Sequence, residues 1–206
     1  MRQYQYHSEG LTPGGMLAFG FHGTGGDERQ FVPLLRRLLP GAGIVTPRGD
    51  VSEMGALRFF RRQGEGRYDM DDLRTRTRAM AAFVAEQAQA AGAGRIVGLG
   101  YSNGANILAS VVFERPELFD EVVLLHPLIP WTPEPVAVRS RVLITAGRRD
   151  PICPPEATRR LADWFRAQGA GVEMLWHPGG HEIAQDEIAA AARFLGAQGG
   201  EDRRSA

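Results

Sequence analysis

The stretch that decides the fold is residues 96–105, which read IVGLGYSNGA. It places Ser102 between Gly100 and Gly104, with an apolar run before the serine and an apolar helical pattern after it. A tight strand-to-helix turn needs glycine two positions either side of such a serine, because larger side chains would clash there. The composition of this chain gives only about 0.1 chance matches to Gly-x-Ser-x-Gly. The stretch therefore predicts that Ser102 is a nucleophile, the alternative being a helix-capping serine in a glycine-rich turn.

Outward from this stretch, short apolar runs alternate with longer helical patterns. The runs expected as strands are Met16–Phe21, Gly43–Thr46, Arg95–Gly100, Glu121–His126, Arg141–Ala146 and Gly171–Trp176, with Gln3–His7 as an edge strand. The expected helices are Arg29–Leu39, Asp72–Ala91, Asn103–Phe113, Pro155–Gln168 and Glu182–Leu195. This alternation predicts an α/β fold with a mostly parallel central sheet and helices on both faces. The loops that follow its strands would gather at one edge, where ligands bind.

Length and composition indicate a single domain over residues 1–206, with residues 196–206 as a flexible tail. Hydrophobic residues make up 43% and charged residues 23%, and the formal net charge is +0, so nothing favours nucleic acid or an anionic membrane as a partner. The one cysteine excludes an intramolecular disulfide. Without a signal-peptide pattern or a run of about 18 apolar residues, we expect a cytoplasmic protein.

A serine nucleophile needs a general base and a carboxylate to orient that base. Asp150 follows an expected strand, and His181 lies in a glycine-rich loop before the last expected helix, which gives the order Ser, Asp, His typical of this arrangement. Each has a plainer alternative. Asp150 would pair with Arg148 or Arg149, and His181 would simply begin a helix.

Other residues compete less well for these roles. His126 is interpreted as a hydrogen-bonded core or loop histidine, and His177 as structural. Asp120 precedes its strand and lies at the wrong edge of the sheet. Cys153 is expected to be a buried, unreactive thiol. The histidines show no recognised metal-ligand spacing, so no metal site is expected.

The segment 21–27, FHGTGGD, follows the first long strand and has the composition of a loop that binds an oxyanion. We expect the N–H groups of Thr24 and Asn103 to form the oxyanion hole, Gly23 to let the backbone approach the substrate, and His22 to orient the loop. A dinucleotide site is the other use of such a loop, but no G-x-G-x-x-G is present. No bound dinucleotide is therefore expected.

The charged segment 48–72 is expected to border the site, because long loops of this kind are more often functional than accidental. Phe59 and Phe60 would form an apolar wall for the substrate. Arg58, with Arg61 and Arg62, would attract a carboxylate or phosphate. The alternative, weighed equally, is that the phenylalanines close the core and the arginines face solvent.

With these motifs in place, the chain resembles the small carboxylesterase/phospholipase branch of the α/β-hydrolases, related to acyl-protein thioesterases and to dienelactone-hydrolase-like proteins. The segments that carry the resemblance are His22–Asp27, Gly100–Gly104, Gly147–Pro151 and Gly180-His181, and less specifically Arg48-Gly49, residues 58–62 and Tyr68-Asp69.

The resemblance implies an α/β-hydrolase fold with no large cap domain, no cofactor, and often a homodimer. It implies a serine carboxylesterase that acts on a small or short-chain ester. Alternatives are a thioesterase or lysophospholipase with the same residues, and a non-catalytic ligand-binding protein on this scaffold. Thr24 departs from the hydrophobic residue of acyl-protein thioesterases, which puts long-acyl substrates in doubt. Ser102 departs from the cysteine of true dienelactone hydrolases, which argues against that reaction.

Overall fold

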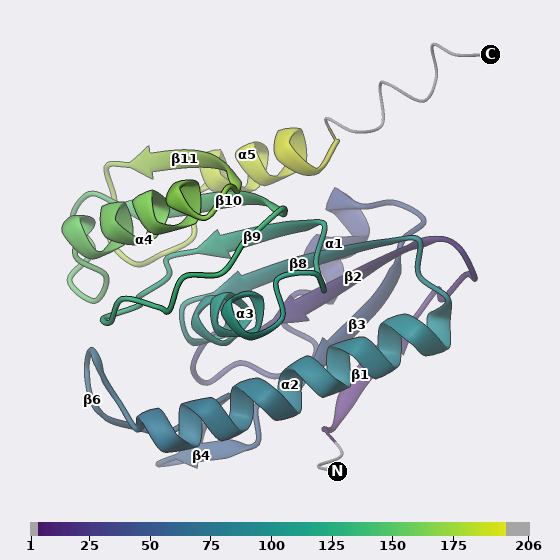
Figure 1. Ribbon diagram of the computed structural model, residues 1–206, viewed down its shortest axis with the longest axis horizontal. Helices are drawn as coiled ribbons and strands as arrows, with labels where there is room; N and C mark the ends of the chain where they lie inside the picture. The colour runs from purple at the N-terminus through teal and green to yellow at the C-terminus, as the bar shows by residue number, and fades with distance from the viewer. Residues whose placement is uncertain (1–3, 197–206) are drawn as a thin grey trace.

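A seven-stranded sheet forms the centre of the computed structural model, which describes residues 4–196 (Figure 1). The strand order is β1-β3-β2-β8-β9-β10-β11, and the bounds are β1 Tyr6–Glu9, β2 Met16–Phe21, β3 Gly43–Pro47, β8 Arg95–Tyr101, β9 Glu121–Leu125, β10 Arg141–Gly147 and β11 Gly171–His177. Only β1 pairs antiparallel within this sheet; the other neighbours are parallel. The expected α/β fold with a mostly parallel sheet is thereby confirmed.

Helices cover both faces of the sheet, and each face has its own apolar cluster. The helices α2 (Met70–Ala91), α3 (Asn103–Glu114) and α4 (Pro155–Ala167) pack on one face, and α1 (Val32–Leu38) and α5 (Gln185–Gly196) on the other (Figure 1). Successive residues of a strand point to opposite faces, so Phe19 joins the cluster under α2, α3 and α4, whereas Ala18 joins the cluster under α1 and α5. The continuous apolar runs of the sequence thus fill two cores.

Three elements begin later than expected. The edge strand β1 is displaced toward the C-terminus, and α1 starts at Val32 because residues 28–31 form turns, with proline in the first helical turn. The helix α5 starts at Gln185, since the preceding backbone is held by side chains: Ala184 N–H donates to Glu187 at 2.5 Å and Gly180 N–H to Glu182 at 3.0 Å. The expected tail, apart from Gly196, lies outside the described residues.

The segment between β3 and α2 contains two small hairpins, which the sequence did not predict. They are β4 (Val51–Glu53) with β5 (Ala56–Arg58), and β6 (Arg62–Gly64) with β7 (Arg67–Tyr68). Strands of two or three residues are too short to show a period in the sequence. The hairpins place Arg58 and Arg62 close to the carboxyl edge of the main sheet, where both line one cavity.

Phe59 and Phe60 lie between these hairpins and are 1% and 0% exposed. Phe59 packs against Phe21 and His22, and Phe60 against Tyr68. The expectation that the two rings would line the site is therefore corrected. They are core residues, because burying two aromatic rings under the hairpins contributes more than leaving them at a solvated surface.

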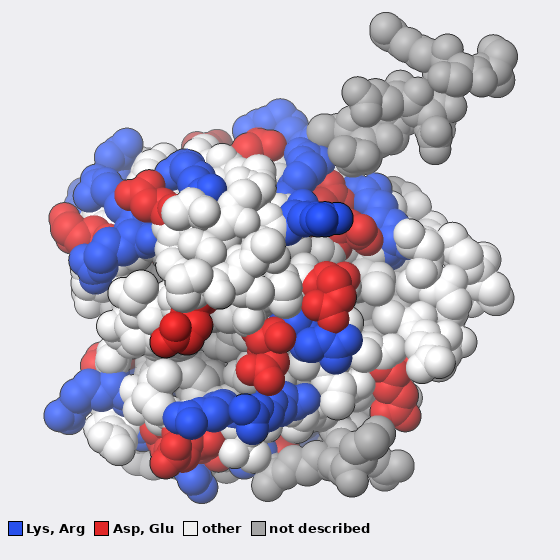
Figure 2. All heavy atoms as spheres, in the orientation of Figure 1, with Lys and Arg blue, Asp and Glu red and all other residues white. Residues whose placement is uncertain are grey.

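Charges of both signs are mixed over the face shown in Figure 2, in keeping with the formal net charge of +0. No helix within residues 4–196 is both long enough and apolar enough to cross a membrane.

Candidate active site

Ser102 lies at the turn between β8 and α3, in a strained conformation with φ 52° and ψ −117°. The flanking glycines make this turn possible. A Cβ on Gly100 would lie 2.6 Å from the Gly104 carbonyl oxygen, and one on Gly104 would lie 2.1 Å from the Phe21 carbonyl oxygen. Because strain of this kind persists only where the surroundings hold it, it is typical of functional sites. The turn directs the Ser102 side chain toward the loops that follow β10 and β11.

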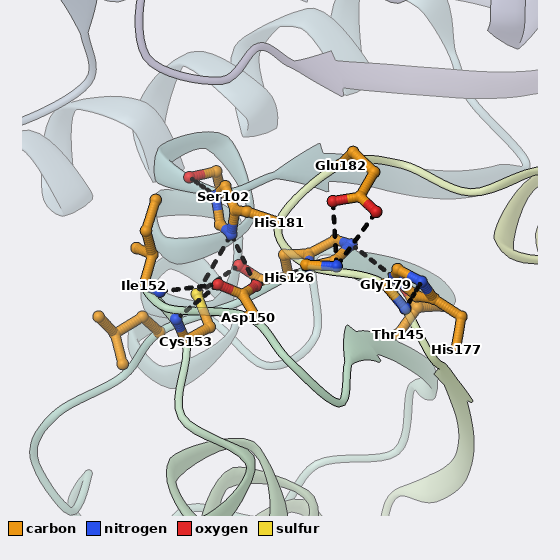
Figure 3. A network of polar contacts seen from close by, with 12 residues as sticks. Ser102, His126, Thr145, Asp150, Ile152, Cys153, His177, Gly179, His181 and Glu182 are labelled. Atoms are coloured by element: carbon orange, nitrogen blue, oxygen red, sulfur yellow. Dashed lines mark hydrogen bonds and ion pairs between the residues drawn. The ribbon is translucent and has the colours of Figure 1, made fainter.

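The side chains of Ser102, His181 and Asp150 meet there in a continuous line (Figure 3). His181 Nε2 lies 2.9 Å from Ser102 Oγ, and His181 Nδ1 lies 2.7 Å from Asp150 Oδ2. Since an ionised carboxylate only accepts, Nδ1 carries the proton and Nε2 is free to accept the serine hydroxyl. Three residues predicted from separate motifs are thus in the geometry of a nucleophile, a base and an orienting acid.

Asp150 is held as a buried carboxylate by donors from several directions. Its Oδ1 accepts the backbone N–H groups of Ile152 at 2.8 Å and Cys153 at 3.0 Å. Burial opposes ionisation, but hydrogen bonds from Cys153 N–H, His181 and His126 hold the pKa of Asp150 below its usual range. Both Arg148 and Arg149 are exposed, and no ion pair among the described residues joins either to Asp150.

Behind Asp150 lies a buried network that the sequence did not predict. His126 Nδ1 is 2.9 Å from Asp150 Oδ2, and His126 Nε2 is 3.1 Å from Glu187 Oε1. His177 Nε2 is 3.4 Å from Glu187 Oε2, and Thr145 donates its hydroxyl to Glu187. His126 is thus buried and has a hydrogen-bond partner at each ring nitrogen, which agrees with the expected core position. Its partners Asp150 and Glu187 come from two other segments of the chain, so the sequence does not reveal them.

Within residues 4–196, two trios of side chains bring their donor atoms close enough to hold a cation: His126 with Asp150 and His181, and His126 with His177 and Glu187. In the first trio, the ring nitrogens face Asp150 at hydrogen-bond distance. In the second, His177 Nδ1 accepts the Gly179 N–H at 3.1 Å, so His177 Nε2 carries a proton and has no lone pair for a metal. Hydrogen bonds among these side chains therefore explain why the members of each trio lie so close together.

The glycine-rich loop after β2 is fixed by His22. This buried ring accepts the Gly49 N–H on Nε2 at 2.8 Å, so its Nδ1 donates to the Gly23 carbonyl at 2.7 Å. Burial lowers the pKa of His22, which keeps the ring neutral. These contacts agree with the loop-orienting role expected for His22.

The two expected oxyanion donors lie beside Ser102. Asn103 is the first residue of α3, and amides in the first helical turn have no acceptor within the helix. Next to Thr24, the Gly23 N–H donates to the Gln30 side chain and the Gly25 N–H donates to the Leu57 carbonyl. Within residues 4–196, the Thr24 N–H donates to no acceptor. Thr24 and Asn103 both border the cavity next to Ser102.

A cavity of about 250 Å³ opens beside Ser102. Side chains from the hairpin segment, α3 and the loop after β10 line it, among them Thr24, Arg58, Arg62, Glu65, Tyr68, Asn103, Asn106, Leu128 and Ile152. Arg58 is only 4% exposed and donates to Thr24 Oγ1 at 2.7 Å. Gly23 is not among the lining residues; its Cβ position is filled by the Tyr101 ring, 2.6 Å away, so glycine serves loop packing there.

Asn106 is a cavity residue that the sequence did not single out, and Tyr68 is one that the sequence marked only through the family resemblance. Asn106 donates to the Tyr68 hydroxyl at 2.9 Å and accepts the Leu128 N–H at 2.7 Å, and the Tyr68 hydroxyl donates to the Leu128 carbonyl at 2.9 Å. Asn103 Oδ1 accepts the Phe59 N–H, but its buried Nδ2 has no partner within the described residues. These polar positions therefore arise from side chains of two segments, β7 and α3, held by backbone groups of Phe59 and Leu128.

Comparison with known proteins gives one family model, the dienelactone hydrolase family, which matches residues 58–194. The putative hydrolase MhqD of Bacillus subtilis (strain 168) is 38% identical over 177 residues, covering 84% of this chain and 88% of that protein. Protein Atu2452 of Agrobacterium tumefaciens, of unknown function, is 54% identical with a TM-score of 0.91, covering 94% of this chain and 96% of its own. The Bacillus cereus carboxylesterase is 33% identical with a TM-score of 0.89, covering 94% of each chain.

Proposed function

Because the chain belongs to the dienelactone hydrolase family, we propose that it is a serine carboxylesterase that hydrolyses small, short-chain carboxylic esters. The observation that carries the proposal is the 2.9 Å contact between Ser102 Oγ and His181 Nε2, with Asp150 on the other ring nitrogen. Similarity to the Bacillus cereus carboxylesterase over nearly the whole chain supports the same reaction.

In the first step, His181 Nε2 takes the proton of the Ser102 hydroxyl while Oγ attacks the ester carbonyl carbon. The carbonyl oxygen becomes an oxyanion, which the Thr24 and Asn103 N–H groups stabilise. The carbon–oxygen bond to the alcohol then breaks, and the alcohol leaves with the proton from His181. Asp150 keeps the imidazole in the tautomer that this transfer needs.

In the second step, water attacks the acyl group on Ser102 and gives its proton to His181. The oxyanion forms again at the same donors, and Ser102 recovers its proton as the carboxylic acid leaves. The chain's own residues supply every proton transfer in both steps, so the proposed reaction needs only the ester and water.

The size of the cavity favours small substrates. At about 250 Å³ it lies below the range of roughly 300–1,000 Å³ that is usual for sites holding drug-sized ligands. A short acyl or alkyl group fits such a space, whereas a long chain would have to extend into solvent. Hydrolysis of thioesters or lysophospholipids by the same residues is the alternative, and a series of substrates distinguishes it.

Two arginines point to a substrate with an acidic group. Arg58 and Arg62 both line the cavity, where they share Glu53, and Arg62 also pairs with Glu65. Glu53 and Glu65 together balance the formal charge of the two arginines. The guanidinium donors still offer a bidentate site for a carboxylate beside the reacting carbonyl, so we propose that esters of this kind bind more tightly than neutral ones.

The proposal is tested with Ser102→Ala and a series of p-nitrophenyl esters, thioesters and lysophospholipids. For the wild-type protein we expect turnover to fall as the acyl chain lengthens. For the variant we expect turnover to fall by roughly 10³-fold or more with unchanged circular dichroism. Near-normal turnover by the variant would refute the role of Ser102, and a folded wild-type protein without turnover on any substrate would favour a ligand-binding protein.

A further inference from the structure

His126 is the buried residue whose role the proposed mechanism leaves unexplained. It follows β9 with a left-handed φ of 51° and is 0% exposed, yet each of its ring nitrogens faces a carboxylate. We propose that His126 is a buried imidazolium that acts as a positioning residue: it shares Asp150 with His181 and, through its charge, extends the acylation of Ser102 to lower pH. The effect of His126 on the reaction rests on the proposed function, whereas the charge of His126 does not.

The geometry requires a proton on both ring nitrogens. A neutral imidazole has one N–H and one lone pair, so one carboxylate would face a lone pair at 2.9 Å (Asp150) or 3.1 Å (Glu187). Two ionised carboxylates with 0% exposed side chains would then remain without a cation between them. An imidazolium donates to both carboxylates and leaves one net negative charge instead of two.

Glu187 is built to stay ionised. It accepts the Thr145 hydroxyl, the Ala184 N–H at 2.5 Å, and His177 Nε2 at 3.4 Å, in addition to His126. Burial opposes this, but the hydrogen bonds from His126 and Thr145 keep the pKa of Glu187 below its usual range. A carboxylate with so many donors is the natural counter-charge for His126.

One alternative is that His126 Nε2 accepts a proton from His177 Nε2, which lies 3.4 Å away. That arrangement would leave the His126 lone pair against Glu187 Oε1, which is closer at 3.1 Å. His177 Nε2–H has an acceptor of its own in Glu187 Oε2. The shorter contact therefore assigns the hydrogen bond to the pair His126–Glu187.

The other titratable groups around His126 do not supply the missing charge. The rings of Tyr101, His177 and His181 pack against it, and the Cys153 thiol donates to its carbonyl. Burial raises the pKa of Tyr101 to about 12 and also raises the pKa of Cys153, so both are neutral near pH 7. Glu182 is the remaining carboxylate near the cluster, and its side chain accepts the Gly180 N–H.

A charged His126 changes how Asp150 acts on His181. Asp150 Oδ2 accepts from both rings, at 2.7 Å from His181 and 2.9 Å from His126. The positive charge of His126, on a ring centred 5.1 Å from that of His181, opposes protonation of His181. Removal of the charge should therefore move the acid limb of Ser102 acylation to higher pH.

The first experiment observes His126 directly by ¹⁵N-detected NMR of the imidazole rings, on wild-type protein and Glu187→Gln. We expect both His126 ring nitrogens to stay protonated between about pH 5 and 8 in the wild type. In Glu187→Gln one of these protons should be lost within that range. A single protonated nitrogen in the wild-type ring at pH 6 would overturn the inference, whether or not the protein hydrolyses esters.

The second experiment compares the pH dependence of Ser102 acylation by a fluorophosphonate in His126→Asn and His177→Gln. Asparagine tolerates the left-handed backbone and keeps a donor toward Asp150, but carries no charge. We expect the acid limb to move up by roughly one pH unit in His126→Asn and to stay in place in His177→Gln, which also removes a buried histidine. Slower acylation with an unmoved limb in His126→Asn would show a packing role only and would overturn the inference.

The two experiments separate the inference from the proposed function. If the wild-type protein is not acylated at all, the proposed function fails, and the NMR measurement still decides the charge of His126. If Ser102 is acylated but the acid limb does not move, the proposed function stands and the inference fails.

Discussion

Arg61 and Arg62 are neighbours in the chain whose side chains have different surroundings. Arg62 is 21% exposed and lines the cavity, whereas Arg61 is 60% exposed and pairs with Asp69. We expect Arg62→Gln to raise KM about fivefold for an ester that carries a free carboxylate, the loss of about 1 kcal/mol of charge-assisted binding. A neutral ester of equal size should bind as before.

The matched control is Arg61→Gln, for which we expect no change in KM with either ester. Steady-state kinetics on the pair of esters measures both variants. Equal increases in KM for the acidic and the neutral ester in Arg62→Gln would rule out recognition of the carboxylate.

Single residues differ in how far the sequence predicts their roles. Ser102, Asp150 and His181 have local signals, since each sits in a glycine- or proline-marked loop after an apolar run. Glu187 has no such signal, because it is one of several acidic residues near the start of α5. Its contact with His126 joins positions 61 apart in the chain, and only the folded sheet brings them together.

Among the elements, β8, β9 and β10 are tied together at their first residues by one carboxylate. Glu121 is 2% exposed and accepts from Arg95 Nε at 2.8 Å and from Arg141 Nη1 at 2.7 Å. We expect Glu121→Gln to lower the free energy of unfolding by about 2 kcal/mol, less than for a fully buried pair because both arginines reach solvent. Turnover should not change, since this edge of the sheet lies opposite Ser102.

Denaturant unfolding followed by circular dichroism measures the loss. Glu173→Gln is the control, because Glu173 also pairs with Arg141 but is 60% exposed, and we expect it to cost less than about 0.5 kcal/mol. A similar loss in both variants would mean that burial of Glu121 adds nothing.

The long elements of the fold follow from periodicity, and the short ones do not. The strand β2 has the bounds expected from its apolar run, and α2, with 22 residues, ends at Ala91 before Gly92 in the left-handed conformation. The hairpins of residues 51–68 are fixed by tertiary contacts instead. The Arg61 N–H, for example, donates to Asp72 of α2 at 2.7 Å. A two-residue strand has no pattern from which it can be predicted.

At the scale of the whole molecule, the buried charges make stability depend on pH. The hydrogen bonds from Glu187 and Asp150 raise the pKa of His126 despite its burial, so its contribution is full below about pH 6.5 and is lost as pH rises through the raised value. The pKa values of Asp150 and Glu187 are lowered, so their contribution is lost as the pH falls below about 4.

The lowered pKa of buried His22 acts in the opposite sense, because below about pH 6.5 the unfolded chain takes up a proton that the folded ring does not. We therefore expect the free energy of unfolding to be highest near about pH 6.5 and to decline on both sides. Urea unfolding at a series of pH values measures this profile. The alkaline decline should be weaker in His126→Asn, which lacks the titrating ring. An identical alkaline slope in wild type and variant would assign that decline to other groups.

The expected homodimer stays a prediction, which light scattering of the purified protein checks. The resemblance to small carboxylesterases is its only support.

The most direct measurement of the central proposal is reaction of the wild-type protein with a fluorophosphonate probe, followed by peptide mass spectrometry to locate the adduct. We expect a single adduct on Ser102, formed faster as His181 loses its proton, and absent from Ser102→Ala. An adduct on another residue, or none on folded protein, would contradict the assignment of Ser102 as the nucleophile.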